Sequence, residues 1–392
     1  MRIVDMSALY SPSGGGIRTY TEQKLVRAAR DGIDLVVVVP GIVDSERRIG
    51  SARMISVASP RFPLDRNYGY FRDDATVHRL LNELAPDMIE CSSPWGSAAA
   101  VARWPGAVPR SLVMHADPMS AWAYRYLDPL FSRATIDRGF RWFWRHLAEC
   151  DSLYDLIICA SPSLKNRLTA QGLKRAELAP LGIEAGLFTP ANRDEALRAE
   201  MLSRCGLGPD ATLLVGVGRL SPEKAWPLVI DAVASAGIKK PLGLVLLGDG
   251  PARSVVQRAV GNNPHIVLLQ PVKSRSHYAG IIASADALVH GCSVETYGLA
   301  CAEARASGVP LIVPDAGGAF DQMAADAGLA WRAGDAASLR AALDELPQRL
   351  PALRAAALAA AAAVPSMDDH FDALFERYRG LIGSRVPRAQ AS

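Results

Sequence analysis

The chain of 392 residues is too long for one ordinary hydrophobic core and fits two domains of common size. Its 43 Lys and Arg residues nearly balance its 40 Asp and Glu residues, so the net charge of +3 gives no reason to expect a nucleic-acid partner. No uninterrupted apolar run approaches the ~20 residues that a membrane-spanning helix needs. The longest candidate, residues 352–364, is interrupted by Arg354 and predicts a helix instead.

The cysteines favour a reducing compartment. The six of them form no CxxC pair and have no regular spacing, and several lie inside apolar runs. Buried, reduced thiols are typical of cytosolic proteins. Because Met1 leads directly into a strand-like segment, we expect no signal peptide and a cytoplasmic protein.

The chain opens with a predicted strand, a glycine-rich loop and a helix. Residues 2–10 have strand character, residues 11–16 read Ser-Pro-Ser-Gly-Gly-Gly, and residues 17–30 predict an amphipathic helix. Backbone amides in such a loop can bind an anion at the carboxyl end of a sheet. The loop is not a GxGxxG motif, because Thr19 stands where the third glycine would be. A plain tight turn is the alternative to phosphate binding.

Further strands follow in the first half, with helical segments between them. Apolar segments at residues 35–40, 86–91 and 111–115 alternate with these helices and predict a mostly parallel sheet. His115 ends the last of these strands, at the edge where open α/β sheets bind ligands. A purely structural role is the alternative for such a lone histidine.

The segment from Trp122 to His146 is unusually rich in aromatic residues and arginines. Only Asp128 and Asp137 oppose the arginine charges there. Aromatic and arginine side chains at helical spacing can lie on an anionic membrane surface or line an acceptor groove. The alternative is a helix pair whose aromatics are core and whose arginines are solvated.

The second half offers a pair of cations at a strand end. Residues 213–218 predict a buried strand that ends at Arg219, and Lys224 follows across a Ser-Pro turn. This spacing can bring a guanidinium and an ammonium onto one diphosphate. Two solvated surface cations are the alternative.

A carboxylate-bearing loop and a short helix follow. Residues 283–290 predict a strand, and residues 299–307 a helix that ends at Gly308. Glu295 then lies near the mouth of this helix, where free amides and the positive end of the dipole also point, while Glu303 lies further along. Such a site suits a ligand with hydroxyls on both sides of a diphosphate, as in a nucleotide sugar. A capping Glu295 and a solvated Glu303 are the alternative.

These motifs, in this order, resemble those of family 4 retaining glycosyltransferases. Glu295 and Glu303 match the E-x7-E segment of that family, Arg219 and Lys224 match its Arg–Lys pair, and residues 248–251 match its G-x-G-P turn. The resemblance spans most of the chain but is sharper between residues 213 and 321 than before residue 185.

Some positions depart from the family pattern. Leu181 replaces the usual Asn of the segment at 179–190, and Asp321 replaces the Glu of G-G-x-x-E. Ala225 stands where a glycine commonly follows the lysine, which predicts a shifted start of the next helix.

The resemblance implies an α/β GT-B fold, in which two Rossmann-like domains face each other across a cleft and a C-terminal helix returns to the first domain. We expect an acceptor-binding domain at residues 1–188, a nucleotide-sugar-binding domain at residues 189–365, and the returning helix at residues 366–392.

The resemblance also implies the roles of individual residues. Those expected to act in catalysis are His115, Arg219, Lys224 and Glu295. Those expected to bind the donor are Gly15, Gly16, Arg219, Lys224, Val272, Glu295, Thr296, Tyr297, Gly298, Leu299 and Glu303.

The function implied is that of a metal-independent, retaining hexosyltransferase without a cofactor, because no D-x-D motif offers ligands for a divalent metal. A UDP-sugar is the preferred donor and GDP-mannose the next. The expected acceptor is a glycan or a lipid-linked sugar of cell-envelope polysaccharide or glycolipid synthesis, with peripheral association at the inner membrane surface.

Three other functions stay open at this point. A sugar-nucleotide epimerase or a phosphorylase could share the fold. An NAD-dependent oxidoreductase is disfavoured, because neither half contains a complete GxGxxG motif. A non-catalytic nucleotide-sugar-binding module is the third alternative.

Overall fold

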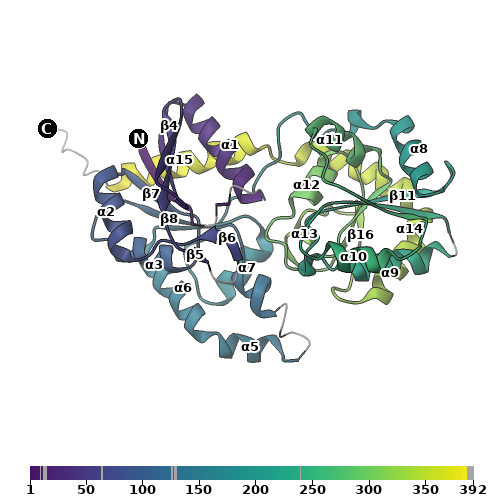
Figure 1. Cartoon of the computed structure of the whole chain (residues 1–392), viewed down its shortest axis with the longest axis horizontal. Helices are drawn as coiled ribbons and strands as arrows, with labels where there is room; N and C mark the ends of the chain where they lie inside the picture. The colour runs from purple at the N-terminus through teal and green to yellow at the C-terminus, as the bar shows by residue number, and fades with distance from the viewer. Residues whose placement is uncertain are drawn as a thin grey trace. The chain divides into compact units, whose positions relative to one another are not determined.

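The computed structural model describes the chain (Figure 1) except for residues 9, 12–15, 63–64, 125–126, 128–129, 239 and 386–392, and the side chains of residues 65–68, 121–122 and 133. The chain forms two compact units. Unit 1 contains residues 1–180 and 367–392, and unit 2 contains residues 181–366. The chain thus leaves unit 1 after Pro180, whereas the sequence placed this boundary at residue 188, and it returns after Ser366.

Unit 1 is built on an eight-stranded sheet in the order β10-β9-β8-β7-β1-β2-β4-β3. Neighbouring strands are parallel except β3, which pairs antiparallel with β4. The strands are β1 (Arg2–Met6), β2 (Asp34–Gly41), β3 (Ser45–Ile49), β4 (Ala52–Ala58), β7 (Met88–Cys91), β8 (Arg110–Met114), β9 (Leu156–Cys159) and β10 (Ala176–Leu178). A separate ribbon contains β5 (Arg61–Phe62) and β6 (Asp65–Gly69).

Helices pack on both faces of this sheet. They are α1 (Gly16–Arg30), α2 (Asp74–Leu84), α3 (Gly96–Arg103), α5 (Arg133–Gly139), α6 (Arg141–Leu153), α7 (Pro162–Ala170) and α15 (Met367–Arg385), with a π-helical turn, η1 (Met119–Tyr124). Val4 and Met6 of β1 join a core that includes side chains of α2, α3 and α6. Because strand side chains alternate, Asp5 points to the opposite face, where its carboxylate contacts α1.

The C-terminal helix α15 belongs to unit 1, as the sequence predicted. Its Tyr378 hydroxyl donates to the Glu90 carboxylate of β7 at 2.6 Å. Arg27 of α1 pairs with Asp368 and Asp372 of α15. A helix that follows unit 2 in sequence is therefore anchored to unit 1 by ion pairs with α1 and by a buried hydrogen bond to β7.

Unit 2 is a second Rossmann-like domain. Its six strands are all parallel, in the order β13-β12-β11-β14-β15-β16. They are β11 (Thr212–Val217), β12 (Leu242–Leu247), β13 (Ile266–Leu269), β14 (Ala287–Val289), β15 (Leu311–Pro314) and β16 (Gly328–Trp331). The helices are α8 (Glu195–Arg204), α9 (Trp226–Gly237), α10 (Arg253–Val260), α11 (Arg275–Ser284), α12 (Leu299–Ala306), α13 (Gly317–Asp321) and α14 (Ala336–Ala360). Short 3₁₀ turns span Pro190–Asn192, Pro222–Lys224 and Ala361–Ala363.

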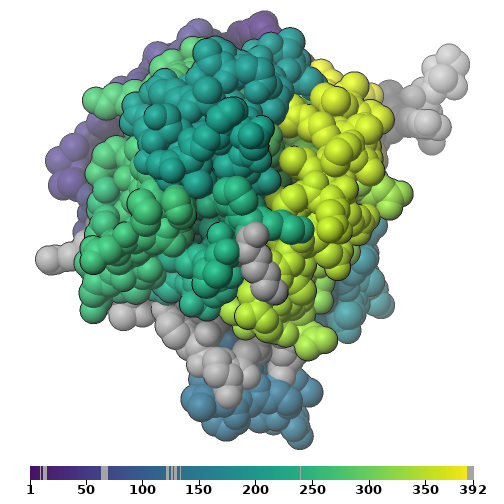
Figure 2. All heavy atoms as spheres, turned by 90° about the vertical axis from the view of Figure 1, so that its right-hand side faces the viewer, coloured from purple at the N-terminus to yellow at the C-terminus, as the bar shows by residue number. Residues whose placement is uncertain are grey.

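A buried carboxylate fastens α8 to the unit 2 sheet. Asp286, just before β14, accepts hydrogen bonds from Arg193, from Arg198 of α8 and from the backbone N–H of Leu213. Figure 2 shows the side of unit 2 on which α8 (teal) and α14 (yellow-green) lie. Such a paired and hydrogen-bonded carboxylate is the form in which a buried charge is tolerated.

Two further expectations can be compared directly with the structure. All six cysteines are free and buried, as their positions in apolar runs predicted. Within the described residues, no helix combines the length and the apolar character that crossing a bilayer requires.

The segment at residues 122–146 is divided between core and surface. Tyr124, Phe143 and Trp144 are buried, whereas Phe131 and Trp142 are about half exposed. Asp137 accepts from the Tyr124 hydroxyl and the Trp144 indole N–H, and so fastens η1, α5 and α6 together. Arg138, Arg141 and Arg145 are exposed. The core interpretation therefore holds for part of the aromatic set, while Phe131 and Trp142 lie beside solvated arginines.

Candidate functional site

The candidate residues of unit 2 gather at the carboxyl edge of its sheet. Strands β11 and β14 are neighbours in the sheet and run parallel to each other. Gly218 and Arg219 follow the end of β11, while His290 follows the end of β14. Because parallel strands end at the same edge, two loops distant in sequence meet here, at the usual ligand-binding position of an open α/β sheet.

Lys224 and Glu295 form the central contact of this edge. The Lys224 ammonium donates to Oε1 of Glu295, and the two side chains are 17% and 19% exposed. Burial alone would raise the pKa of Glu295, but Lys224 and His290 outweigh it and hold that pKa well below its usual range. Burial would lower the pKa of Lys224, yet Glu295 raises it above the ordinary lysine value. Both groups are therefore charged at neutral pH.

His290 is a neighbour that the sequence reading assigned only to a strand. Its Nε2 lies 3.1 Å from Oε1 of Glu295, although the two atoms do not meet hydrogen-bond geometry, and both ring nitrogens are buried without a hydrogen-bond partner. Burial lowers the pKa of His290, so the imidazole is neutral near pH 7. Its position after an apolar strand and before Glu295 was the available signal.

His290, Cys292 and Glu295 are also the one group in the described part of the chain whose donor atoms lie close enough to share a metal ion. Two features oppose this use. The Lys224 ammonium already bonds the carboxylate oxygen that faces His290, and burial raises the pKa of the Cys292 thiol to about 12. A cation entering here would have to displace Lys224 and remove that thiol proton.

Glycines shape the loop that carries Glu295. Gly298 has φ of 83°, in the left-handed region that favours glycine. A Cβ on Gly318 would lie 2.6 Å from the backbone nitrogen of Tyr297, so only glycine fits against the loop. The Gly318 N–H donates to the Glu295 carbonyl at 2.7 Å, and the Gln322 side chain donates to the Tyr297 carbonyl at 3.0 Å. The Gly317–Gly318 segment thus packs against the loop that carries Glu295 and is hydrogen-bonded to it.

Helix α12 begins immediately after this loop, at Leu299. The N–H groups of its first turn have no carbonyl acceptor within the helix, and they carry the positive end of its dipole. Thr296, Tyr297 and Gly298 connect Glu295 to this helix start. A negative group placed beside the Lys224–Glu295 pair would therefore meet an ammonium and a helix N-terminus together.

Glu303 lies one turn further along α12 and is buried. Its carboxylate accepts from the Tyr278 hydroxyl at 2.6 Å and from Arg275 at 3.3 Å. Burial raises the pKa of Glu303, and these two donors only partly offset that effect. Arg275 also pairs with Glu184 at 3.3 Å and stacks on Phe188. The sequence reading named Glu303 but missed Tyr278 and Arg275, whose approach depends on how α11 packs.

The two remaining donor-binding candidates of unit 2 are less constrained. Arg219 is exposed, and its carbonyl accepts from the indole N–H of Trp226 at 3.1 Å. Val272 lies half-buried in the loop between β13 and α11. Ala225 adopts the left-handed conformation (φ 49°) that the family pattern gives to glycine, and α9 still begins at the next residue, Trp226.

Unit 1 supplies the other candidates. His115 follows β8, and its ring lies edge-on against Tyr20 with centroids 4.7 Å apart. Burial lowers the pKa of His115 to about 4, so the imidazole is neutral at physiological pH. Gly16 is exposed at the first position of α1, whereas Gly15 lies outside the described residues.

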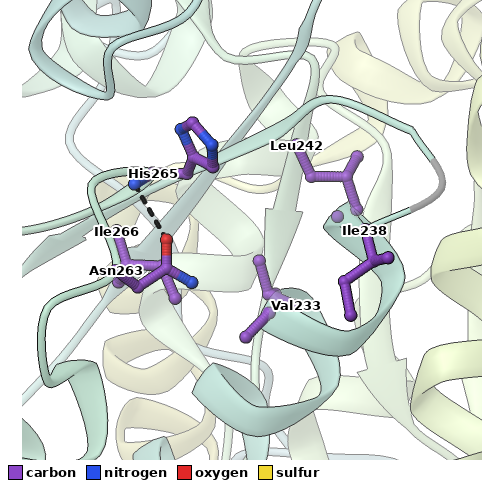
Figure 3. Close-up of a pocket in the computed structure, with 8 residues that line it drawn as sticks. Val233, Ile238, Leu242, Asn263, His265 and Ile266 are labelled. Carbon is purple, nitrogen blue, oxygen red and sulfur yellow. Dashed lines mark hydrogen bonds between the residues drawn. The ribbon is translucent and has the colours of Figure 1, made fainter.

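A shallow hollow of about 220 Å³ lies elsewhere in unit 2 (Figure 3). Val233 and Ile238 of the α9 end, Leu242 at the start of β12, and Asn263 and His265 before β13 line it. It is therefore at the amino edge of the sheet, opposite the edge that carries Lys224 and Glu295. Its lining is mostly apolar, and it contributes no group to the site described above.

Comparison with known proteins identifies the family. The sequence profile described as Glycosyltransferase Family 4 matches residues 14–187, and the profile described as Glycosyl transferases group 1 matches residues 211–349. A GDP-mannose-dependent alpha-mannosyltransferase of Mycolicibacterium smegmatis is 30% identical over 83% of this chain and 82% of its own. The chain belongs to glycosyltransferase family 4.

Other relatives of this glycosyltransferase carry similar names. A GDP-mannose-dependent alpha-mannosyltransferase of Mycobacterium tuberculosis is 29% identical over 82% of this chain and 81% of its own. A GDP-mannose-dependent alpha-(1-6)-phosphatidylinositol dimannoside mannosyltransferase of the same species is 27% identical over 84% of this chain and 83% of its own.

Solved structures agree on the fold. Sucrose-phosphate synthase from Thermosynechococcus elongatus superposes with a TM-score of 0.76 at 17% identity, covering 98% of this chain and all of that one. The catalytic domain of starch synthase IV from Arabidopsis thaliana gives a TM-score of 0.66 at 15% identity, covering 98% of this chain and 99% of that one. The predicted α/β GT-B fold is confirmed. This glycosyltransferase transfers a sugar from a nucleotide sugar to an acceptor.

Proposed function

We propose that this glycosyltransferase transfers mannose from GDP-mannose with retention of anomeric configuration and without a metal ion. The names of the relatives support this donor, because three of them at 27–30% identity over more than four-fifths of the chain are GDP-mannose-dependent. The sequence alone placed a UDP-sugar first. GDP-mannose is now the preferred donor, and UDP-sugars are the competing substrates in the test below.

The contact that carries the proposal is the Lys224–Glu295 ion pair at the start of α12. A nucleoside diphosphate leaving group develops negative charge, which preorganised donors stabilise in the transition state. Lys224, Arg219 and the first amides of α12 suit this task. Glu295 suits the sugar hydroxyls, and Glu303 suits the ribose. Because Lys224 already supplies a cation at the Glu295 oxygen, the reaction has no need of a divalent metal there.

Retention fits the absence of an obvious base among the described candidates. His115 and His290 are weak bases, because burial lowers their pKa values, and the Glu295 carboxylate is already paired with Lys224. In a front-face mechanism the departing phosphate takes the proton of the acceptor hydroxyl, so the protein has only to orient the two substrates and stabilise charge. A neutral His115 serves as a hydrogen-bonding partner of the donor sugar.

A lipid-linked acceptor at an anionic membrane surface completes the proposal. Trp142 of α6 is 53% exposed, and Arg141 and Arg145 flank it on the same exposed side of the helix. Leu130 and Phe131, before α5, are 72% and 52% exposed. Apolar and aromatic side chains beside arginines are the composition of an interfacial surface that binds anionic lipids. Peripheral association from the cytoplasmic side would place the enzyme beside such an acceptor.

The donor is tested by ligand-dependent stabilisation and by product release. Thermal unfolding is followed with GDP-mannose, UDP-glucose, UDP-galactose and ADP-glucose at equal concentration, and nucleoside diphosphate release is measured with and without a phosphoinositide mannoside acceptor. We expect GDP-mannose to give the largest rise in Tm, because a ligand that binds only the native state stabilises it. A larger rise and faster turnover with a UDP-sugar would overturn the mannosyl proposal.

Stereochemistry and metal dependence are tested on the same reaction. Proton NMR of the first product should show the α-anomer when the α-linked donor is used. Turnover should persist in excess EDTA after extensive dialysis. A β-linked product would exclude retention, and complete loss of activity that Mg²⁺ or Mn²⁺ restores would exclude metal independence.

A further inference from the structure

A chain of contacts runs from the C-terminal helix to His115. His370 of α15 lies 3.1 Å from the Tyr20 hydroxyl through Nε2 and 2.9 Å from the Pro180 carbonyl through Nδ1. The Tyr20 ring in turn lies edge-on against His115, with an interplanar angle of 67°. Tyr20 and His370 are each 3% exposed, so water does not compete for these contacts.

The directions of the hydrogen bonds follow from chemistry. The Pro180 carbonyl can only accept, so Nδ1 of His370 must carry the proton. Burial lowers the pKa of His370 to about 4, so at neutral pH its Nε2 has a free lone pair. The Tyr20 hydroxyl must then donate to Nε2, which fixes both the tautomer of His370 and the orientation of the Tyr20 hydroxyl.

The Tyr20 ring is held on other sides as well. Its centroid lies 5.2 Å from that of Phe371, the residue next to His370, and the Lys24 ammonium lies 5.9 Å from it. Tyr20 therefore has little freedom to move away from His115. His115 itself lacks a polar anchor at Nε2, which is buried without a hydrogen-bond partner. Among the described ring contacts, the one that His115 makes is the edge-on contact with Tyr20, which constrains the plane of the imidazole.

We propose that Tyr20 and His370 are positioning residues that hold the His115 imidazole in the orientation used on the donor sugar. The C-terminal helix thereby contributes to catalysis through a hydrogen bond to Tyr20, beyond its packing on α1. This inference rests on the proposed role of His115 in sugar transfer. It explains why a polar, buried histidine occupies a helix face that otherwise packs Phe371, Leu374 and Phe375 into the core.

The test compares Tyr20→Leu, Tyr20→Phe and His370→Phe with the wild type. Misplacing a substrate-contacting group by about 1 Å can cost up to ~100-fold in rate. We expect Tyr20→Leu and His370→Phe to lower kcat by about 10- to 100-fold with little change in the donor KM. Tyr20→Phe keeps the ring and loses only the hydroxyl, so its loss should be smaller than that of Tyr20→Leu.

Tyr154→Phe is the matched control. Its hydroxyl is also buried in unit 1 and donates to the Ala98 carbonyl, which is not part of the contacts that join His370, Tyr20 and His115. If it lowers Tm as much as Tyr20→Phe does while kcat stays near the wild-type value, loss of stability does not explain the effect. An equal loss of kcat in both variants would overturn the proposal.

A double-mutant cycle and a direct view of the ring separate this inference from the proposed function. In a His115→Ala background, Tyr20→Leu should cause no further loss of kcat, because both act through one imidazole. If His115→Ala lowers kcat but the losses of the two single variants multiply in the double variant, only the positioning role is wrong. If His115→Ala leaves kcat unchanged, both the role of His115 in transfer and the positioning role are wrong. In ¹⁵N-histidine-labelled protein, the His115 ring signals should shift in Tyr20→Leu and His370→Phe but not in Tyr154→Phe. Unshifted signals in the first two variants would contradict the inference whatever the substrate.

Discussion

Lys224 bonds Glu295 although 71 residues of sequence separate them. Adjacent parallel strands explain the meeting, because β11 and β14 end side by side and their loops share one edge. The pair gives the site a cation and an anion that are both partly shielded from water. A bound diphosphate can share the ammonium, while the carboxylate stays available to a sugar hydroxyl.

Lys224→Met should lower kcat/KM for transfer by about 10²–10³-fold, since it removes a preorganised donor to the leaving group. Steady-state kinetics with GDP-mannose measure the change. Lys240→Met is the matched control, because its ammonium also lies in unit 2 but donates to the Asp344 carbonyl. Equal activity of Lys224→Met and the control would contradict the role of Lys224 in the leaving-group site.

Glu295→Gln should change the acid dependence of stability. Because the folded pKa of Glu295 lies below its unfolded value, the ionised carboxylate stabilises the fold above about pH 4, and this contribution is lost as pH falls through the folded pKa. Glu295→Gln should therefore cost the most stability at neutral pH, and the difference from wild type should shrink below about pH 4. Urea unfolding between pH 3 and 7 measures this. A difference that stays constant over that range would contradict the assignment.

Tyr278→Phe should weaken donor binding through Glu303. The Tyr278 hydroxyl donates to the Glu303 carboxylate at 2.6 Å, and hydrogen bonds to a charged group contribute about 1.5–3 kcal/mol. We expect the donor KM to rise roughly tenfold or more with a smaller effect on kcat. Because the hydroxyl lowers the already raised pKa of Glu303, its removal should move the acid limb of kcat/KM to higher pH.

Tyr154→Phe is the control for this change, since it also loses one buried phenol hydrogen bond, to the Ala98 carbonyl in unit 1. It should lower Tm without moving the acid limb. An unmoved acid limb of kcat/KM in Tyr278→Phe would show that titration of Glu303 in the free enzyme does not limit donor capture.

Lys24→Met should destabilise unit 1 strongly. Lys24 is fully buried, and its ammonium lies 3.1 Å from Asp5 and 2.5 Å from Glu90, which face each other on adjacent strands. Removing the only described cation that pairs with both carboxylates should cost about 3–5 kcal/mol of unfolding free energy. Lys174→Met, at an exposed position, should change the unfolding free energy little.

The loss in Lys24→Met should also grow with pH. Burial raises the pKa of Asp5 to about 7 even beside Lys24, whereas the pKa of Glu90 is lowered in spite of burial because Lys24 and Tyr378 stabilise its charge. Without Lys24, the pKa values of Asp5 and Glu90 in the folded protein should both lie above their values in the unfolded chain. The native state then binds more protons than the unfolded state, so stability falls as pH rises from about 5 to 8. Denaturant unfolding at these pH values checks the slope, and a loss independent of pH would contradict it.

Trp142→Ala combined with Arg141→Glu and Arg145→Glu should reduce binding to vesicles that contain anionic lipid. Co-sedimentation with phosphatidylinositol vesicles measures this, and each arginine near such a surface contributes about 1 kcal/mol. Ile238→Ala with Arg340→Glu, also on exposed positions but in unit 2, should bind as the wild type does. Unchanged binding of the α6 variant would remove this helix from the proposed membrane surface.

Much of the fold and part of the site could be read from local sequence. Apolar runs predicted β2, β7, β8 and β11, and the segment after Gly298 predicted α12 almost to the residue. Strand ends then pointed to His115, Arg219 and Glu295, because ligand-binding residues of open parallel sheets follow the strands. The strand predicted at residues 283–290 was too long. Ala283 and Ser284 end α11 and only Ala287–Val289 is strand, because a short apolar run has no period that separates helix from strand.

The sequence by itself determined which segments form strands and helices and which loops carry charge, because those properties depend on neighbours along the chain. Only the tertiary structure decided that His290 lies beside Glu295, that Tyr278 bonds Glu303, and that Tyr20 joins His370 to His115. Each of these contacts depends on strand order or helix packing, which bring together residues far apart in sequence. It also decided which aromatic side chains of α6 are core, because burial depends on the surface that a helix meets and not on the helix alone.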